Sequence, residues 1–241
     1  MRPLANLLAP VARRLIYPGG HTRVPAEQTD LALRVDGVTL RGWEVNPGQD
    51  RALIHYGGNG EGLEWLVPEL GRRFPGHTSY LVAYRGYGAS EGTPDERALT
   101  KDALAVFDHA AARHGERVDV VGRSLGSGVA MQVAVRRPLE RLVRVTPFDS
   151  LVATAADLYP WLPVHHLLLD RWDSASVAPR LRAPTLVIRA GRDAVVRPRR
   201  TDALLEVLPS ETEVLDLPDA QHATLHEDPA YWRAMERFLS P

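Results

Sequence analysis

Hydrophobic and polar residues follow two repeating patterns along this chain. Short runs that are apolar at nearly every position are typical of strands buried on both faces of a sheet. Longer segments with apolar residues every three to four positions are typical of helices that bury one face. The two patterns take turns along most of the sequence, which predicts an α/β fold with a mostly parallel central sheet flanked by helices.

The expected elements cover most of the chain. Strands are expected at residues 31–35, 38–45, 52–56, 79–83, 118–121, 142–145, 185–188 and 213–217. Helices are expected at residues 63–74, 95–114 and 229–239, and directly after Ser124 and Pro198. The dipeptide Asp36-Gly37 favours a tight turn between the first two strands, so we expect these two strands to form an antiparallel hairpin.

The alternation stops between Leu151 and Ala183. We predict that this segment, 151–183, is a small helical cap inserted into a single domain, 1–241, near the carboxyl ends of the strands. Trp161 and Leu162 are predicted to form an apolar wall of a substrate pocket. The alternative is that they only pack on the sheet. A small roof predicts a modest, partly open cavity.

The most specific signal is the pentapeptide from Gly122 to Gly126, which has the pattern G-x-S-x-G. It follows an apolar strand and precedes an apolar helix, so a strand, a sharp turn and a helix meet at Ser124. This is the geometry of a nucleophile elbow, in which the turn pushes the serine hydroxyl out above the sheet. The simpler alternative is that Ser124 only caps the helix and the glycines mark a turn.

Composition narrows the possible functions. A chain of 241 residues that is 44% hydrophobic and 24% charged is large enough to bury a full core. The net charge of −1 gives no electrostatic reason to expect nucleic acid as a partner. The absence of cysteine excludes disulfides, thiolate catalysis and thiolate metal sites. We expect neither a metal nor a cofactor.

The segment 1–17 is mildly apolar but is interrupted by prolines and by Arg13-Arg14. It is too short and too interrupted to span a bilayer, which takes about 20 apolar residues, and it lacks the layout of a secretory signal. A cytoplasmic protein without an integral membrane segment is therefore expected. Its apolar residues suit one helix face that packs on the protein itself, with contact to a membrane surface as the alternative. These residues are Leu4, Leu7, Leu8, Val11, Leu15 and Ile16.

Five separated blocks, taken in their order, resemble the α/β-hydrolase superfamily, in particular Bem46-like serine hydrolases with a short cap. The blocks are 55–61 (HYGGNGE), 84–92 (YRGYGASEG), the 122–126 elbow, 191–193 (GRD) and 221–222 (QH). Where many such relatives read His-Gly-Asn, this chain has Gly57-Gly58-Asn59. The difference matters little, because this block contributes a backbone N–H to the chemistry.

Serine hydrolases of this fold carry their catalytic residues in the order Ser, Asp or Glu, His. Ser124 is then the nucleophile and His222, in a loop directly after a strand, is its base. His226 is the other candidate base, but we expect it to act as a local cap at the start of the last helix. Asp193 is the expected acid, with Asp149 as the alternative, because both follow strands.

A serine hydroxyl needs a base to accept its proton and two backbone donors to stabilise the oxyanion. The expected donors are the N–H groups of Leu125 and Asn59, and Gly58 lets the backbone approach the substrate. The resemblance implies a hydrolase that acts on a small ester or thioester through an acyl-serine intermediate. An amidase or peptidase, or a binding protein of this fold without activity, remains open. The oligomeric state is not predicted.

Overall fold

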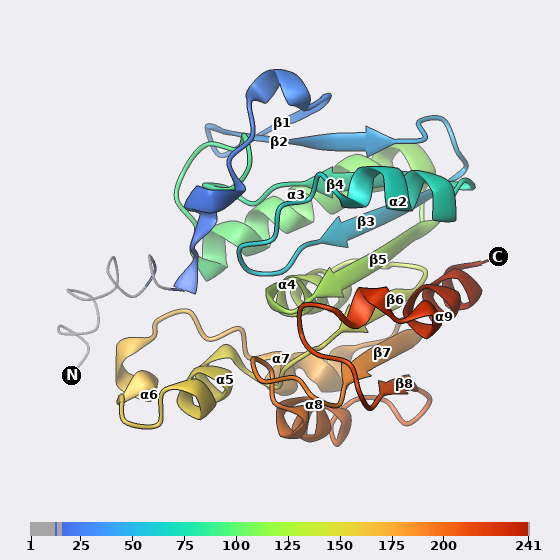
Figure 1. The fold of residues 1–241 in the computed structure, drawn as a ribbon. Coiled ribbons are helices and arrows are strands. Elements are labelled where there is room, and N and C mark those ends of the chain that lie inside the picture. Colours follow the sequence, from blue (N-terminus) through green and yellow to red (C-terminus); the bar gives the residue numbers. More distant parts are fainter. Residues whose placement is uncertain (1–12, 14–15, 241) are drawn as a thin grey trace.

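The structure is a computed structural model that describes residue 13 and residues 16–240. Its centre is an eight-stranded sheet with helices on both faces (Figure 1). The strands are β1 (Leu31–Val35), β2 (Val38–Val45), β3 (Arg51–Tyr56), β4 (His77–Val82), β5 (Val118–Arg123), β6 (Leu142–Val145), β7 (Thr185–Ala190) and β8 (Glu213–Leu217). The helices are α2 (Leu66–Arg73), α3 (Glu96–His114), α4 (Leu125–Ala134), α5 (Leu151–Leu158), α6 (Val164–Leu167), α7 (Ser174–Val177), α8 (Pro198–Leu205) and α9 (Pro229–Leu239). Short 3₁₀ turns are η1 (Gly19–Thr22), η2 (Ala26–Gln28), η3 (Ala178–Arg180) and η4 (Leu225–Glu227).

The strand order is β1-β2-β4-β3-β5-β6-β7-β8. The strands from β4 to β8 in this order pair in parallel, whereas β1 pairs antiparallel with β2 and β2 with β4. The predicted hairpin is confirmed: Asp36 and Gly37 both have positive φ, the conformation that such a tight turn requires. The mostly parallel α/β sheet is also confirmed, and its central strand β5 ends at the elbow.

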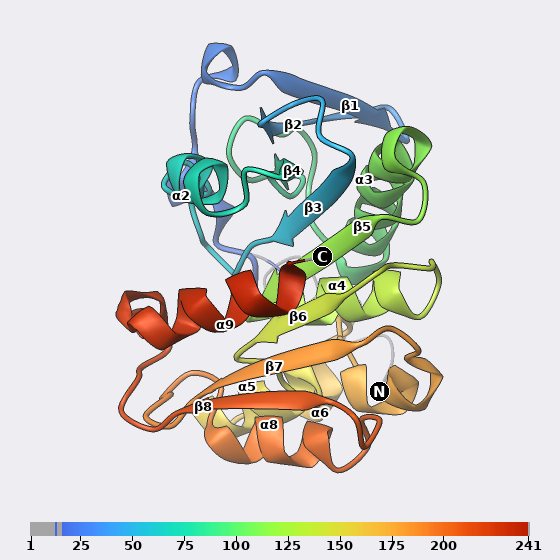
Figure 2. The same cartoon turned by 90° about the vertical axis from the view of Figure 1, so that its right-hand side faces the viewer.

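Helices cover the two faces of the sheet as two separate layers (Figure 2). On one face, α3, α4 and α8 contribute Leu99, Val129 and Leu204 to a large apolar cluster. On the other face, α2 and α9 contribute Leu70 and Met235 to a second cluster. The parallel strands are apolar on both faces because each face is buried under helices.

The observed helix starts reflect local capping. The predicted helix 95–114 begins at Glu96, because the Asp95 side chain accepts a hydrogen bond from the Ala98 N–H at 2.8 Å. The predicted helix 63–74 is shorter, and α2 begins only at Leu66. Residues 57–65 form a loop that enters this helix from the carboxyl end of β3.

The segment 151–183 contains the short helices α5, α6 and α7 and the turn η3. In Figure 1, α5 and α6 lie beyond the carboxyl ends of β6 and β7. Trp172 anchors this segment: it is fully buried, and its indole N–H donates to the Tyr17 hydroxyl at 2.9 Å. Its role as a cap over a substrate stays a prediction.

Most of the N-terminal apolar face predicted above, namely Leu4, Leu7, Leu8, Val11 and Leu15, lies outside the described residues. Ile16, the described member of this face, packs against the cluster under α3 and α4. In the part of the chain that the structure describes, no helix is both long enough and apolar enough to cross a bilayer.

Candidate active site

The turn after β5 holds Ser124 in a strained backbone conformation, with φ 50° and ψ −116°. Neighbouring backbone leaves no room for side chains on either side. A Cβ at Gly122 would lie 2.3 Å from the Gly126 carbonyl oxygen, and one at Gly126 would lie 2.0 Å from the Tyr56 carbonyl oxygen. Although Ser124 stands at the N-cap position of α4, its side chain makes no capping hydrogen bond. A strained serine between close-packed glycines is the arrangement of a nucleophile elbow.

The Ser124 hydroxyl instead contacts His222, with Oγ 3.0 Å from Nε2. The other ring nitrogen, Nδ1, lies 2.6 Å from Asp193 Oδ2. Because the carboxylate only accepts, Nδ1 carries the proton, and Nε2 is left to accept from the serine. Three residues from the ends of β5, β7 and β8 are thus joined in one hydrogen-bonded chain.

Asp193 is rigidly held and nearly fully buried. Its second oxygen, Oδ1, accepts hydrogen bonds from the backbone N–H groups of Val195 and Val196, each at 2.8 Å. Asp149, the alternative acid, is paired elsewhere: its Oδ2 lies 3.0 Å from the Arg200 guanidinium. The structure therefore brings Asp193, and not Asp149, to His222.

The two N–H groups predicted as oxyanion donors are not used elsewhere in the described part of the chain, and their role in the chemistry stays a prediction. Among residue 13 and residues 16–240, the N–H groups of Leu125 and Asn59 make no hydrogen bond. The side-chain oxygen of Asn59 accepts from the Tyr87 hydroxyl at 2.8 Å, which fixes this residue in its loop. Gly58 lies directly beside the serine, since a Cβ there would be 3.7 Å from the Ser124 Cβ.

Ser124 and His222 open into a cleft of about 750 Å³. One side of this cleft is the loop after β3, and the other is the loop that carries His222. Its lining residues are Gly58, Asn59, Gly60, Glu61, Gly62, Glu64, Trp65, Arg123, Ser124, His222, Ala223 and His226. The volume suits a small-molecule ligand.

The aromatic wall of the cleft comes from residues that the sequence analysis did not select. Trp65 stacks against His226, with ring centroids 4.8 Å apart. His226 is therefore a cleft residue in η4. The prediction that it caps the last helix was wrong, because the cap of α9 is Asp228. Trp161 and Leu162, the predicted wall, do not line this cleft, and Trp161 is 73% exposed.

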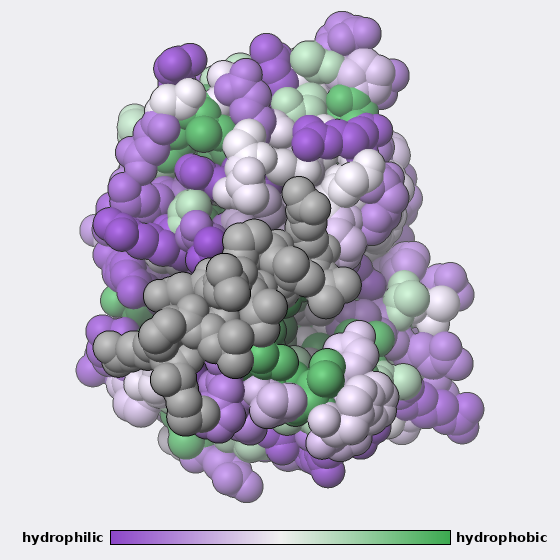
Figure 3. Space-filling view, turned by 90° about the vertical axis from the view of Figure 1, so that its left-hand side faces the viewer, coloured by the Kyte–Doolittle hydropathy of each residue, from purple (hydrophilic) through white to green (hydrophobic). Residues whose placement is uncertain are grey.

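Hydrophobic surface is still present near the predicted cap. Figure 3 faces the carboxyl edge of the sheet, and green residues gather in its lower half, at the height of α5 and α6. Tyr159, Trp161, Leu162 and Leu169 are the large exposed hydrophobic residues of this segment. Contact of Trp161 or Leu162 with a substrate stays a prediction.

A buried ion pair lies directly under the cleft. Glu61 Oε1 is 3.1 Å from Arg123 Nη1, and only 7% of the Glu61 side chain and 13% of the Arg123 side chain are exposed. Burial alone would raise the pKa of Glu61, but Arg123, His55 and the Gly58 N–H together hold it below its ordinary value. Glu61 is thus a carboxylate at neutral pH. The sequence analysis did not select either residue, although both stand in the quoted motifs; the charge directly before the nucleophile is the signal that could have pointed to them.

Nothing in the described residues forms a metal centre: residue 13 and residues 16–240 contain no group of three or more His, Asp or Glu side chains placed to hold a metal ion.

Known proteins resemble this chain over about half to nearly all of its length. An uncharacterized protein of Mycobacterium tuberculosis is 32% identical over 245 residues, covering 95% of this chain and 87% of that protein. The alpha/beta hydrolase domain-containing protein WAV2 of Arabidopsis thaliana is 26% identical over 183 residues, covering 66% of this chain and 59% of that protein. The lysophosphatidylserine lipase ABHD12 of Macaca fascicularis is 53% identical over 133 residues, 47% of this chain and 33% of that protein. No family model matches the chain.

Among solved structures, an esterase of Pyrococcus furiosus has the same fold, with a TM-score of 0.70 over 87% of this chain and 88% of that chain, at 18% identity. The sheet, with an elbow at the end of its central strand, indicates the same family as the sequence relatives. These relatives match the chain over its full length or over part of it. The chain belongs to the α/β-hydrolase superfamily.

Proposed function

We propose that this protein is a serine hydrolase that cleaves a small carboxylic ester or thioester through an acyl-Ser124 intermediate, without a metal or cofactor. One observation carries the proposal: the chain of hydrogen bonds from Ser124 through His222 to Asp193 opens into a cleft of about 750 Å³. The names of the lipase and esterase among the similar proteins support an ester as substrate.

In the first half of the reaction, Ser124 Oγ attacks the carbonyl carbon while His222 Nε2 takes the hydroxyl proton. The bond from carbon to the leaving oxygen or sulfur then breaks, and His222 returns the proton to the leaving group. Asp193 accepts a hydrogen bond from Nδ1, so it fixes the tautomer of His222 and stabilises the imidazolium that forms.

Negative charge develops on the carbonyl oxygen during the attack. The N–H groups of Leu125 and Asn59 are the donors for this charge, and they need no rearrangement because both belong to tightly held turns. In the second half, His222 takes a proton from water, the resulting hydroxide attacks the acyl carbon, and the proton returns to Ser124 as the acid product leaves.

The proposal is tested with a fluorophosphonate probe, which labels activated serines, and with esters, thioesters and anilides of increasing acyl length. Wild-type protein is expected to be labelled once per chain. Ser124→Ala is expected to lose the label and to lower kcat by about 10⁴-fold or more.

Three other outcomes would change the proposal. Labelling that persists in Ser124→Ala places the nucleophile elsewhere. Cleavage of anilides in preference to esters makes the protein an amidase. Wild-type protein that is folded but neither labelled nor active indicates a binding protein with a hydrolase fold.

A further inference from the structure

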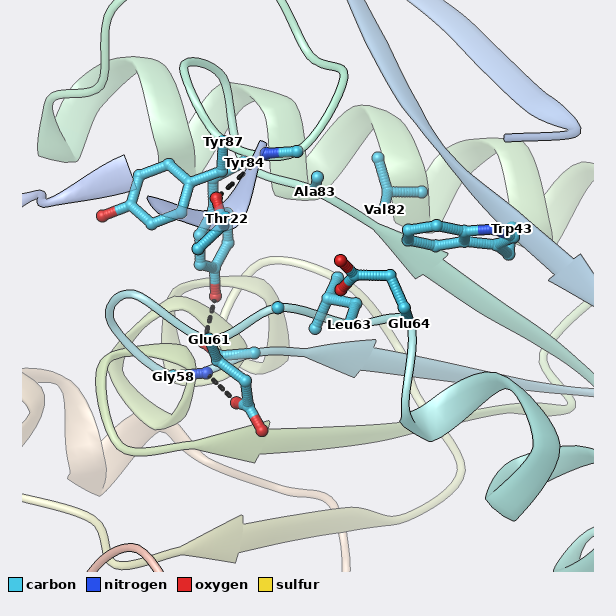
Figure 4. Close-up of a pocket in the computed structure, with 13 residues that line it drawn as sticks. Thr22, Trp43, Gly58, Glu61, Leu63, Glu64, Val82, Ala83, Tyr84 and Tyr87 are labelled. Atoms are coloured by element: carbon cyan, nitrogen blue, oxygen red, sulfur yellow. Dashed lines mark hydrogen bonds between the residues drawn. The ribbon is translucent and has the colours of Figure 1, made fainter. Parts of the chain in front are cut away.

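The loop after β3, residues 57–62, is here termed the glycine loop. It is held from within by Glu61, whose side chain folds back so that Oε2 accepts a hydrogen bond from the Gly58 N–H at 2.5 Å (Figure 4). The N–H of the next residue, Asn59, has no partner in the described part of the chain. Glu61 thus occupies one of two neighbouring donors and leaves the other available.

Arg123 connects this loop to the elbow and to the loop that carries His222. Its Nη1 lies 3.1 Å from Glu61 Oε1, and its Nη2 donates to the His222 carbonyl oxygen at 2.9 Å. Arg123 also precedes Ser124 directly. One guanidinium therefore contacts the loop of the oxyanion donor and the loop of the base, from the residue next to the nucleophile.

Two tyrosines hold the far side of the glycine loop, and Figure 4 shows the hydrogen bond made by Tyr84. The Tyr84 hydroxyl donates to the Gly57 carbonyl oxygen at 2.8 Å, and the Tyr87 hydroxyl donates to the Asn59 side chain at 2.8 Å. The space between these tyrosines and the loop is only about 10 Å³, at most one water molecule, so it does not serve as a substrate pocket. The two tyrosines therefore fix the loop on this side, and Glu61 fixes it on the side of the cleft.

We propose that Glu61, held by Arg123, is a positioning residue. It accepts the hydrogen bond of the Gly58 N–H and thereby leaves the Asn59 N–H as the oxyanion donor of the glycine loop. Arg123 keeps this donor in a fixed position relative to Ser124 and His222. This inference rests on the proposed function. A buried ion pair contributes little net stability compared with apolar residues of the same volume, so stability alone does not account for its presence beside the serine.

The pair formed by Arg51 and Asp119 provides a matched control. It is similarly buried, with 13% and 0% of the side chains exposed, and Arg51 Nη2 donates to Asp119 Oδ2 at 2.9 Å. It joins the starts of β3 and β5 at the amino edge of the sheet, and it contacts neither the glycine loop nor the loops that carry Ser124, Asp193 and His222. Asp119→Ala therefore reports what the loss of a buried pair does to the fold alone.

The experiment compares Glu61→Ala, Glu61→Gln and Asp119→Ala with wild type, using ester hydrolysis normalised to serines labelled by fluorophosphonate. Glu61→Ala is expected to lower kcat by about 10²–10³-fold, the usual cost of one oxyanion donor, with KM within about threefold of wild type. Glu61→Gln keeps an acceptor for the Gly58 N–H and is expected to recover part of this loss. Asp119→Ala is expected to lower the melting temperature and to leave kcat per labelled serine unchanged.

A second measurement separates positioning from folding. A trifluoromethyl ketone forms a tetrahedral adduct whose oxyanion takes the place of the transition-state oxygen, so its affinity in Glu61→Ala is expected to fall by the same factor as kcat/KM. A carboxylate product, which lacks that geometry, is expected to bind as it does to wild type. The single variants of Glu61 and Arg123 are expected to be non-additive, because the two residues act as one unit.

Equal kcat per labelled serine in Glu61→Ala and Asp119→Ala would overturn the positioning role and leave the proposed function intact. An unchanged affinity for the ketone in Glu61→Ala would overturn it as well. Wild-type protein without label or activity would overturn both proposals. If Glu61→Ala does not fold, Glu61→Leu together with Arg123→Met removes the acceptor and both charges, leaves no unpaired buried charge, and tests the same expectation.

Discussion

Among residue 13 and residues 16–240, two Asp–His pairs lie at opposite ends of the same sheet. At the carboxyl edge, His222 Nδ1 lies 2.6 Å from Asp193. At the amino edge, where β4 and β5 begin, His77 Nε2 lies 3.1 Å from Asp119. Both histidines meet a buried carboxylate, so the contact alone does not distinguish a reactive site from a structural one.

The residues around each pair distinguish the structural pair from the pair in the candidate active site. Asp119 Oδ2 also accepts from the Arg51 guanidinium at 2.9 Å, and Arg51 reaches Glu140 as well, so this network joins the starts of strands. The Asp119 side chain is fully buried, which closes it to a substrate. At the other edge, the second nitrogen of His222 faces a strained serine in an open cleft. An Asp–His pair thus becomes chemically useful only where loops add a nucleophile, free donors and access.

The largest expected contrast comes from removing each carboxylate in turn. Asp193→Asn is expected to lower kcat by about 10³–10⁴-fold, because His222 loses the partner that fixes its tautomer. Asp119→Asn is expected to leave kcat per labelled serine unchanged and to lower the melting temperature. The stability loss should stay below the ~3–5 kcal/mol of an isolated broken pair, because Glu140 still pairs with Arg51.

Steady-state kinetics and thermal unfolding of both variants check this contrast. A large loss of kcat in Asp119→Asn at full folding would show that the two edges are coupled. A mild effect of Asp193→Asn would remove the acid from the proposed mechanism.

The buried histidine His55 in β3 sharpens the comparison, because neither ring nitrogen has a hydrogen-bond partner among the described residues. Burial lowers the pKa of His55 from 6.5 to about 4, with opposing effects of Glu61 and Arg123. Between these two values the unfolded chain binds a proton that the folded chain excludes. The free energy of unfolding should therefore fall as pH decreases from 6.5 to 4, by up to about 3 kcal/mol from this residue.

Urea unfolding of wild type and His55→Leu at several pH values between 4.5 and 7 measures this effect. The variant is expected to show a smaller loss of stability on acidification, since the other titrating groups are common to both proteins. Parallel curves for the two proteins would exclude His55 as the cause.

Substrate selectivity tests which of two aromatic surfaces at the carboxyl edge of the sheet contacts the acyl group, that of Trp65 or that of Trp161. Trp65→Ala is expected to change the relative kcat/KM for short and long acyl esters by about 10-fold, the range of one apolar contact in a pocket. Trp161→Ala is expected to leave that profile unchanged, because its side chain is largely exposed outside the cleft. A changed profile in Trp161→Ala alone would restore the predicted substrate wall of the segment 151–183.

The smallest expected effect is that of Asp149→Asn. Its side chain pairs with Arg200 and makes no hydrogen bond to His222, so kcat is expected to stay within about threefold of wild type. A loss as large as that of Asp193→Asn, with the variant folded, would reverse the assignment of the acid.

The sequence alone determined the features that depend on neighbouring residues. Apolar runs and helical periodicity predicted the strands and helices to within a few residues, because burial on one or both faces imposes a local pattern. Asp36-Gly37 predicted the hairpin, and the two glycines around Ser124 predicted the elbow, because only such residues tolerate these turns. The order of Ser124, Asp193 and His222 followed from the fold that these elements imply.

Tertiary structure decided which loops meet. Asp149 and Asp193 both follow strands, and only the placement of β7 beside β8 brings Asp193 to His222. Likewise, Glu61 and Arg123 lie 62 positions apart, and they pair because β3 and β5 are neighbours in the sheet although β4 lies between them in sequence. Local patterns carry no information on such distant contacts. The path of the loop after β3 similarly places Trp65, and not Trp161, in the cleft into which the serine opens.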